Sequence, residues 1–588
     1  MKVLLIMVAL FLTLVNPTQY ITNSKEWRDV YLTLHYADLA GESSFFIRNE
    51  EHGTKVLPYF VSKSEPVVIV ESETNAFIPN YETYLKTLGF TNVSTLKTQH
   101  PYLLQEQFLE MLKNNSVPLT GFVLVDDAYG YDAVSVAQYA FKYKKWVLFT
   151  TKENRNRISS LLEANPGYPI LFYGHMRREI ADAISKFNIE KIDNQSRFRN
   201  NMELAEMMIK NINSRQILLT SGEYIEHEIM SGGDGNEVIL FVSADKYPED
   251  IINFIRKHNI KYVTVVGNEL INTAREVKEA MGGEITVIAK YGVGYVGVAE
   301  LQGQIYALDL FYLPKYQFNL TPVSAVYNPS TKELYIRFKN NGNVGNYFYT
   351  SAPIVVDENS VTTVIDKENQ FLEPGDEKVI VYNVDLTGYI DKKMYAHLYT
   401  KYGESPYDMM YYILEPGAVR PPYKMPILVQ EYEDNSQLEI VDGWYDDISK
   451  EYIIQVSNVG PVDAYAKGEL KDIVVDGIPR TITQNGTVFI RRGETASLPI
   501  HLELLDEDKK VNPTIHAIVY YGQSQDILIK KAEKDIELKS QLCLLPILLI
   551  VALLIAMIIG YYIWKKRKTH HKAKTHHEHA GERSGRNE

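Results

Sequence analysis

The sequence has almost no cysteine, with one in 588 residues. A disulfide framework needs paired cysteines and a thiolate metal site needs several, so both are excluded. An excess of positive charge is also missing, because the formal net charge is −13. Nucleic acid is therefore not an expected partner. Hydrophobic residues at 45% and charged residues at 23% are ordinary globular values, and this length predicts several domains.

Long hydrophobic runs occur at the two ends of the chain. The first follows Lys2 and continues to Val15 before a polar exit, which is typical of a secretory signal peptide within residues 1–18. A buried strand or helix is the alternative. The second run, residues 542–564, has no charged side chain and is long enough to cross a bilayer as a helix. Its alternative is a helix of a protein core.

The flanks of the second run predict its orientation. Aromatic side chains that favour the membrane interface lie at its far end, and a basic cluster that favours the cytoplasm follows directly: Tyr561, Tyr562, Trp564, Lys565, Lys566, Arg567 and Lys568. We therefore expect a single-pass protein of the cell membrane with an extracellular N-terminal ectodomain. Residues 565–588 form a basic, His-rich cytoplasmic tail in this prediction. The tail carries +5, which leaves −18 for the rest of the chain and favours divalent cations outside the cell.

Residues 25–300 alternate short apolar segments with amphipathic helical patterns. Such a pattern predicts flavodoxin-like βα units whose parallel sheets are buried on both faces. The expected strands are residues 67–71, 121–126, 146–151, 169–174, 216–221, 237–243 and 262–267. The pattern also repeats, since Phe149 matches Phe241 after 92 residues and Gly174 matches Gly267 after 93. A shorter preceding copy would make three repeats.

Several stretches of this head resemble a known family. SRFRNNMELAEMM, YDAVSVAQYA, VLFTTKEN, VILFVSADKYPEDIINFI and KYVTVVGNELINTAREVKEAMG are similar to the cell wall binding repeat 2 module of bacterial surface proteins. The resemblance implies that three repeats pack as a pseudo-trimer. It also implies non-covalent binding of anionic wall polymers.

Candidate site residues lie where predicted strands end. Asp126, Asp127 and Asp132 follow the strand 121–126, at the edge where parallel sheets bind ligands. Their carboxylates could bind Ca²⁺, or act as acid and base in a membrane-tethered hydrolase. The favoured alternative is that Asp126 and Asp127 cap the next helix or accept loop amides. The glycine-rich segment 231–236 is expected to be a loop before a strand, which is the wrong context for binding phosphate. No catalytic motif was found in the sequence, so we do not expect an enzyme.

After about residue 300 the helical pattern gives way to short alternating segments. These predict two Ig-like β-sandwiches, at 318–415 and 427–538, with a proline-rich hinge at 415–426. The two are copies, because Asn340 matches Asn458 and Gly375 matches Gly493 at the same spacing of 118. They resemble adhesion-type Ig-like modules of archaeal and bacterial surface proteins, which implies spacers or interaction surfaces.

The sequence thus predicts a multidomain protein with an α/β repeat head, two Ig-like sandwiches and one C-terminal transmembrane helix. Its expected role is structural, as a surface-layer (S-layer) component of an archaeal envelope. Its expected partners are the lipid bilayer, further copies or other envelope proteins, and cell-surface polysaccharide. The alternative is a receptor or adhesin whose head binds a polysaccharide or peptide. Five Asn-x-Ser/Thr sequons are candidates for glycosylation, at Asn92, Asn114, Asn194, Asn319 and Asn485.

Overall fold

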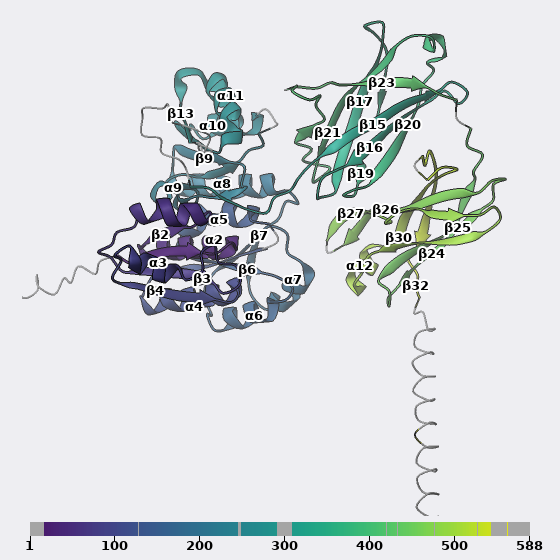
Figure 1. Ribbon diagram of the computed structural model, residues 1–588. Coiled ribbons are helices and arrows are strands. Elements are labelled where there is room, and N and C mark those ends of the chain that lie inside the picture. Colours follow the sequence, from purple (N-terminus) through teal and green to yellow (C-terminus); the bar gives the residue numbers. More distant parts are fainter. Residues whose placement is uncertain are drawn as a thin grey trace, which may run out of the picture. The chain divides into compact units, whose positions relative to one another are not determined.

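A computed structural model describes residues 17–126, 129–244, 248–290, 309–418, 420–431, 433–475, 477–525, 527–541 and 561. The chain forms two compact units. Unit 1 contains the residues up to 322 together with 339–376 and 392–426. Unit 2 contains 323–338, 377–391 and the residues from 427 onward. Along the chain, an α/β region with parallel sheets precedes a β-rich region (Figure 1).

The α/β region contains three parallel sheets of four strands each. Their strand orders are β2-β1-β3-β4, β6-β5-β7-β8 and β11-β9-β12-β13, so each repeat has the same topology. This order matches the first four strands of the flavodoxin-like sheet. The strands are β1 (Gln19–Asn23), β2 (Ser43–Phe46), β3 (Val67–Ser72), β4 (Val93–Thr98), β5 (Gly121–Asp126), β6 (Lys145–Thr150), β7 (Ile170–Tyr173), β8 (Ile189–Ile192), β9 (Gln216–Thr220), β11 (Ile239–Phe241), β12 (Tyr262–Val266) and β13 (Thr286–Lys290).

The helices between these strands follow ordinary helix-forming rules. The Ser196 side chain caps α8 by accepting a hydrogen bond from the Arg199 amide at 3.3 Å. In α10, acidic residues begin the helix and basic residues end it, which suits the helix dipole. The α-helices of the region are α2 (Trp27–Ala40), α3 (Tyr81–Thr87), α4 (Pro101–Asn114), α5 (Tyr131–Lys142), α6 (Arg155–Glu163), α7 (Arg178–Ile184), α8 (Arg197–Ile212), α9 (His227–Gly235), α10 (Glu249–Lys257) and α11 (Ile271–Met281).

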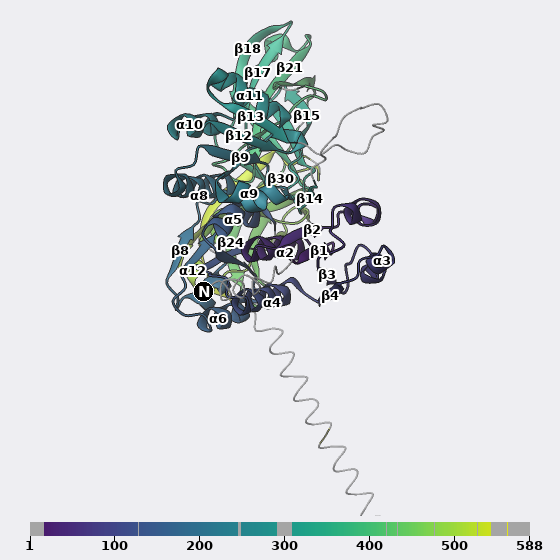
Figure 2. The ribbon, with the colours of Figure 1, turned by 90° about the vertical axis from the view of Figure 1, so that its left-hand side faces the viewer.

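Three equivalent helices lie at the centre of the α/β region. α2, α5 and α9 each follow the first strand of a repeat, and they contact one another pairwise (Figures 1 and 2). A single hydrophobic core includes residues from all three repeats. On α2, the buried His35 ring stacks on Trp146 with centroids 5.2 Å apart, and its Nε2 lies 3.0 Å from the Lys145 carbonyl oxygen. Burial lowers the pKa of His35 to about 4, so the ring is neutral at physiological pH.

Most of the expected elements are present, and two expectations need correction. All seven predicted strands form, although β11 is shorter than 237–243. The segment 231–236 was wrongly expected to be a loop, because residues 231–235 end helix α9. The Glu226 carboxylate starts this helix by accepting the amides of Glu228 and Ile229 at 2.7 and 3.3 Å. The first repeat also begins before residue 25, since β1 is fully buried within its sheet.

In the β-rich region, the strands between residues 311 and 429 correspond to the first predicted sandwich. Their order is β18-β17-β21-β23-β15-β16-β20, with β19 paired to β17 and β22 paired to β21; β14 pairs with β10 of the α/β region. The strands are β10 (Tyr224–Ile225), β14 (Phe311–Tyr312), β15 (Leu320–Asn328), β16 (Glu333–Asn340), β17 (Asn346–Val356), β18 (Asn359–Ile365), β19 (Gln370–Leu372), β20 (Glu377–Asn383), β21 (Met394–Gly403), β22 (Tyr411–Tyr412) and β23 (Tyr423–Val429). We call these β-rich residues module 1.

Residues 438–541 form module 2, in which two sheets share one hydrophobic core. The first sheet has the order β29-β25-β24-β32. The second has the order β27-β26-β30-β31, with β28 paired to β26. The elements are β24 (Leu438–Asp446), β25 (Glu451–Asn458), β26 (Ala464–Val475), β27 (Ile478–Thr483), β28 (Val488–Ile490), β29 (Thr495–His501), α12 (Asp506–Val511), β30 (Thr514–Gly522), β31 (Lys530–Glu537) and β32 (Ser540–Gln541).

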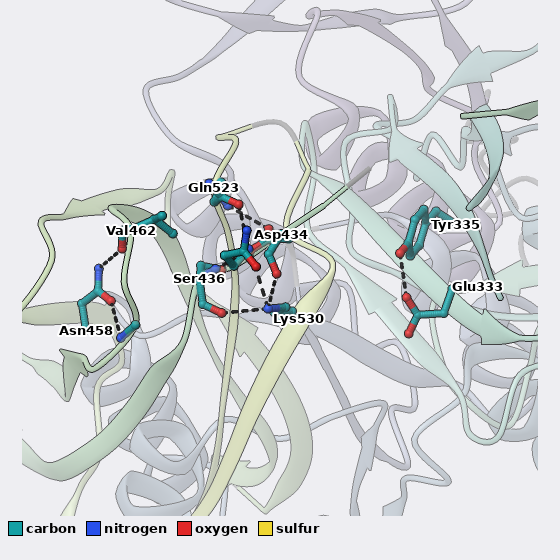
Figure 3. Close-up of polar contacts among 10 residues, drawn as sticks. Glu333, Tyr335, Asp434, Ser436, Asn458, Val462, Gln523 and Lys530 are labelled. Carbon is teal, nitrogen blue, oxygen red and sulfur yellow. Dashed lines mark hydrogen bonds and ion pairs between the residues drawn. The ribbon is translucent and has the colours of Figure 1, made fainter. Parts of the chain in front are cut away.

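A buried asparagine fixes the same turn in both modules. Asn458 Nδ2 donates to the carbonyl oxygens of Val462 and Ile490 at 2.8 and 3.1 Å, and its Oδ1 accepts the Gly460 amide at 3.0 Å (Figure 3). Asn340 makes the equivalent three bonds 118 residues earlier. A buried tyrosine hydroxyl likewise accepts the Leu386 amide in module 1 and the Leu504 amide in module 2, each at 2.9 Å. The two modules thus make equivalent contacts at the spacing of 118 residues that the sequence shows.

The predicted terminal segments lie mostly outside the described residues. This applies to residues 1–16 of the predicted signal peptide, to the cytoplasmic tail, and to the predicted membrane span except Tyr561, which is helical and exposed. Tyr562, Trp564, Lys565, Lys566, Arg567 and Lys568 are therefore predictions from sequence alone. Among the residues that the structure describes, no helix is both long and apolar enough to cross a membrane.

The asparagine turn gives a test of module stability. Replacing Asn458 with Ala removes three hydrogen bonds of a buried side chain to the backbone, so we expect module 2 to lose about 3 kcal/mol of unfolding free energy. Thermal unfolding of the full chain in detergent, followed by hydrogen exchange of module 2, measures the loss. Ser497→Ala, on the exposed side of β29, is the matched control. Equal stability of the two variants would contradict this role for Asn458.

Candidate functional site at the carboxyl ends of the repeat strands

The crevice beyond β5 and β7 is the expected ligand position of the second repeat. Asp126 ends β5 and Asp132 lies in the first turn of α5, so the structure brings both predicted carboxylates to this crevice. Asp127 lies outside the described residues. An Asp126 carboxylate oxygen is 3.1 Å from a terminal nitrogen of Arg177, which immediately precedes α7. An arginine from the neighbouring loop thus neutralises the acid at the strand end.

Asp132 faces the glycine that follows β7. Gly174 has a φ of +91°, and a Cβ atom there would lie 2.1 Å from Asp132 Oδ2, so only glycine fits. Desolvation raises the pKa of Asp132 to about 8, and the nearby charges of Asp126 and Glu404 act in the same direction. Asp132 is therefore largely protonated at neutral pH. A protonated carboxyl group is a poor cation ligand.

A buried arginine lies in the same part of unit 1. The Arg197 guanidinium, at the start of α8, lies 4.0 Å from the ring centroid of Tyr131 and 5.2 Å from that of Tyr316. Its Nε is 3.6 Å from Glu404 Oε1, which follows β21. Desolvation opposes the charge, but Glu404 and Tyr131 outweigh it and raise the pKa of Arg197. Burial raises the pKa of Glu404, while Arg197 opposes this rise. The aromatic rings and one acid therefore hold the cation without a bidentate bond.

Module 2 has its own cation at the equivalent position. Lys530 Nζ donates to the carbonyl oxygens of Asp434 and Ser436 at 2.5 and 2.8 Å, and Asp434 Oδ2 accepts the Gln523 amide at 2.9 Å (Figure 3). Lys530 lies 119 residues after Tyr411 of module 1, and Gln523 lies 119 residues after Glu404. The cation is thus supplied by α8 in one case and by the module itself in the other.

The crevices of the first and third repeats are bridged by side chains as well. In the first, Asn23 Nδ2 on β1 donates to Glu71 Oε2 on β3 at 2.9 Å. In the third, the Ser221 hydroxyl after β9 donates to Glu269 Oε1 after β12 at 2.7 Å. All three repeats therefore use this position for contacts between the first and third strands of their own sheet.

The arrangement at these crevices does not form a metal centre within the described residues, where no group of three or more His, Cys, Asp or Glu side chains is placed to hold an ion. The Ca²⁺ site that Asp126, Asp127 and Asp132 could form stays a prediction from sequence, because Asp127 lies outside the described residues. The favoured alternative, that Asp126 and Asp127 cap the next helix or accept loop amides, stays a prediction for the same reason.

A groove of about 530 Å³ lies elsewhere in unit 1, beside α8 and α10. Phe198, Phe254 and Tyr407 give it aromatic walls, and Tyr407 is 63% exposed. Arg199 contributes charge, with Nε 3.8 Å from an Asp408 carboxylate oxygen. No motif in the sequence pointed to this groove, because its lining comes from segments about 200 residues apart. Exposed aromatic rings beside polar groups are suited to holding a sugar or a peptide.

All five predicted sequon asparagines are exposed: Asn92, Asn114, Asn194, Asn319 and Asn485. Asn194 is partly engaged, since its Nδ2 donates to Glu203 Oε2 at 2.6 Å. Access for glycosylation is therefore compatible with the fold at each of these positions.

Comparisons with known proteins show no family for this chain. No family profile matches it, and no curated protein matches it. Cwp6 from Clostridium difficile is 13% identical over 42% of this chain and 40% of its own, with a TM-score of 0.31. Cwp8 from the same organism is 12% identical over 45% of this chain and 48% of its own, with a TM-score of 0.34. The class 5 fimbriae chaperone CfaA is 12% identical over 37% of this chain and 99% of its own, with a TM-score of 0.14.

The matches thus span less than half the length of Cwp6 and Cwp8. TM-scores this low support no transfer of function. The resemblances to cell wall binding repeat 2 and to adhesion-type Ig-like modules stay predictions from sequence.

The raised pKa of Asp132 predicts a pH-dependent stability. The folded state keeps the proton up to about pH 8, whereas the unfolded chain loses it near pH 4, so stability falls as pH rises between these values. Asp132→Asn cannot ionise and removes this dependence, with a gain on the order of 3 kcal/mol at pH 7. Thermal unfolding of the full chain between pH 5 and 8.5 measures the effect. Asp182→Asn, exposed on α7, is the control, and parallel profiles for wild type and Asp132→Asn would refute the argument.

The Arg197 cluster predicts a coupled effect of two substitutions. Arg197→Met leaves the buried Glu404 without its counter-charge and should cost about 3 kcal/mol of unfolding free energy. Adding Glu404→Gln should recover much of this loss, because the remaining polar group is neutral. Calorimetry of the full chain compares the variants with Arg199→Met, whose side chain is 53% exposed. Additive losses in the double variant would contradict direct pairing.

Proposed function

We propose that this chain is a structural protein of the cell envelope, anchored in the membrane and forming part of a surface layer. A signal peptide within residues 1–18 directs export, and the hydrophobic segment 542–564 is the anchor. The α/β repeats form an extracellular head, the two modules form an Ig-like β-sandwich stalk, and the basic tail remains in the cytoplasm. Sequence supports both terminal assignments.

The observation that carries a structural role is the bridging of the three strand-end crevices. These are the positions where parallel sheets bind substrates and cofactors. Here Asn23–Glu71, Asp126–Arg177 and Ser221–Glu269 connect neighbouring loops at those positions. Such contacts stabilise the repeats and are not arranged as nucleophile and base. We therefore propose no catalytic activity and no resident cofactor.

Two further features support an extracellular location. The five sequon asparagines are exposed, as glycan attachment requires. The acidic charge belongs to the part of the chain before the tail, and acidic copies packed side by side would repel unless cations lie between them. In this proposal Ca²⁺ binds between copies and helps the layer cohere.

A receptor or adhesin is the second candidate, and the groove beside α8 and α10 favours it. Exposed Tyr407 and the half-buried Phe198 offer ring surfaces, and Arg199 and Lys257 offer hydrogen-bond donors. The ligand class would be a cell-surface polysaccharide or a peptide. A receptor would need few copies per cell, whereas a layer needs many.

Intact cells offer the direct test of the structural proposal. Protease added outside should digest residues 25–540 and spare a label fused after Trp564. Electron cryotomography should show a periodic canopy that chelation of divalent cations disperses. Cells from which the gene is deleted are the control for the canopy. A protected ectodomain would refute the topology, and a scarce, unordered surface protein would favour the receptor.

A further inference from the structure

One sheet face of module 1 is rich in tyrosine, and the strand positions that form it carry no acid. The outward positions of β17, β18, β19, β21 and β22 form what we call the tyrosine face. Its side chains are Tyr347, Tyr349, Ser351, Pro353, Val355, Thr363, Ile365, Phe371, Tyr395, His397, Tyr399, Lys401 and Tyr412. None of these positions of the described strands carries a carboxylate, although the chain has 74 Asp and Glu.

Large side chains on this face are open to solvent. Ile365 is 51% exposed, Tyr399 is 41% exposed and Tyr395 is 38% exposed. Their neighbours on the sheet are also apolar, since Tyr347 packs on Phe371 with ring centroids 4.7 Å apart. A contiguous apolar sheet face of this kind is typical of a binding surface, and tyrosine is enriched at such surfaces.

Module 2 shows how this fold uses the same face. Ile518, which corresponds to Tyr399, is only 3% exposed. Beside it, Glu469 Oε2 is 3.0 Å from Lys378 Nζ on β20, and the Tyr520 hydroxyl donates to Glu469 Oε1 at 3.0 Å. The Lys378 ammonium also lies 4.6 Å from the Tyr520 ring centroid. Within unit 2, the face of module 2 is therefore an interface that takes the start of strand β20.

The duplication provides an equivalent strand for the open face. β29 corresponds to β20 at the same spacing of 118 residues, and it is an edge strand of its sheet. Ala496 replaces Lys378, and on the face Ser351 replaces Glu469. The counterparts of both partners in the Lys378–Glu469 ion pair are thus uncharged, one on β29 and one on the tyrosine face. At this position β29 and the tyrosine face would meet without an ion pair, whereas β20 and its acceptor face are matched by opposite charge.

We propose that the tyrosine face of one copy of this chain binds the start of β29 on a second copy. The contact repeats between chains the packing of β20 on the face of module 2 within one chain. The two surfaces differ, so each copy keeps one of each and the contact propagates into an array. This inference rests on the proposed structural role and names the contact that builds the layer.

The size of the face suits a weak, repeated contact. At about 3.3 Å per residue and about 4.8 Å between strands, β17 and its neighbours cover roughly 500 Å². A partner surface that covered the whole face would bury about 1,000 Å² in total, which is near the lower limit for a specific interface, and the start of β29 covers part of it. Weak contacts of this kind allow an ordered layer to correct its errors during assembly.

Cysteine cross-linking in native membranes tests the contact. Cys543, the single cysteine, is first replaced by Ser, and Ser351→Cys and Thr495→Cys are then introduced together. Thr495 is exposed and lies beside Ala496. A short bifunctional maleimide should convert this full-length variant into a ladder of multimers. The control pair, Ser351→Cys with Thr514→Cys, uses an exposed residue of the same module and should stay monomeric.

A second variant tests the chemistry of the face with residues that the fold already accepts. Tyr349→Lys and Tyr395→Thr introduce the residues found at the equivalent positions of module 2, Lys467 and Thr514. In the cross-linkable background these two changes should lower the multimer yield at least fivefold. Circular dichroism and the thermal midpoint should stay unchanged.

The outcomes separate this inference from the proposed function. A ladder that disappears in the Tyr349→Lys, Tyr395→Thr variant supports it. Monomers in every variant, or a dimer formed by Ser351→Cys alone, overturn it, because the latter means face-to-face pairing. The inference is also overturned if added cell-surface polysaccharide abolishes the ladder and the purified chain forms no ladder. That result assigns the face to a glycan. Failure of external protease to reach the ectodomain refutes the proposed location, whatever the cross-linking result.

Discussion

In these parallel sheets the strand order reverses between the first and third strands, and a crevice lies beyond the carboxyl ends of those two strands. The polar groups at that edge need partners, and in many folds a ligand supplies them. In this protein the chain supplies them three times, through Asn23 with Glu71, Asp126 with Arg177 and Ser221 with Glu269. In each repeat a side-chain contact therefore spans this edge of the sheet, and its free energy holds the first and third strand ends together.

The β-rich region is also built from repeated contacts. Two modules share the asparagine turn, the buried tyrosine hydroxyl and the strand order around β17 and β26. They differ on one face, where module 1 carries Tyr349 and module 2 carries Lys467. Because the backbone is common to both, this difference is not imposed by folding. The composition of this face is thus free to differ between the two copies.

Much of the fold could be predicted from periodicity and spacing. Gly174 and Gly267 were paired by a spacing of 93, and both follow the third strand of their repeat with positive φ, where a side chain would be strained. Asn340 and Asn458 were paired in the same way, and their bonds to the turn explain the match. Positions whose local geometry accepts only one residue type can therefore be recognised from the sequence.

Other features could not be recognised from the sequence. The edge strand β8 (Ile189–Ile192) was missed because two of its four residues are charged and exposed. Arg197 was missed as a buried cation, since its partners Tyr131 and Glu404 are distant in sequence and none of the three forms a motif. The Asp132 position was predicted, but its protonation depends on desolvation by the folded crevice. Segment 231–236 was misjudged because the upstream cap at Glu226 outweighs the helix-breaking tendency of its glycines.

The two cations at equivalent ends of the modules have a consequence for how such a chain can grow. Lys530 closes the end of module 2 with a charge that belongs to module 2, so nothing upstream is required there. Module 1 receives Arg197 from α8 and is incomplete without it. Evolution can therefore lengthen this protein by adding self-sufficient copies after module 2. It cannot insert one directly after the α/β region without orphaning a charge.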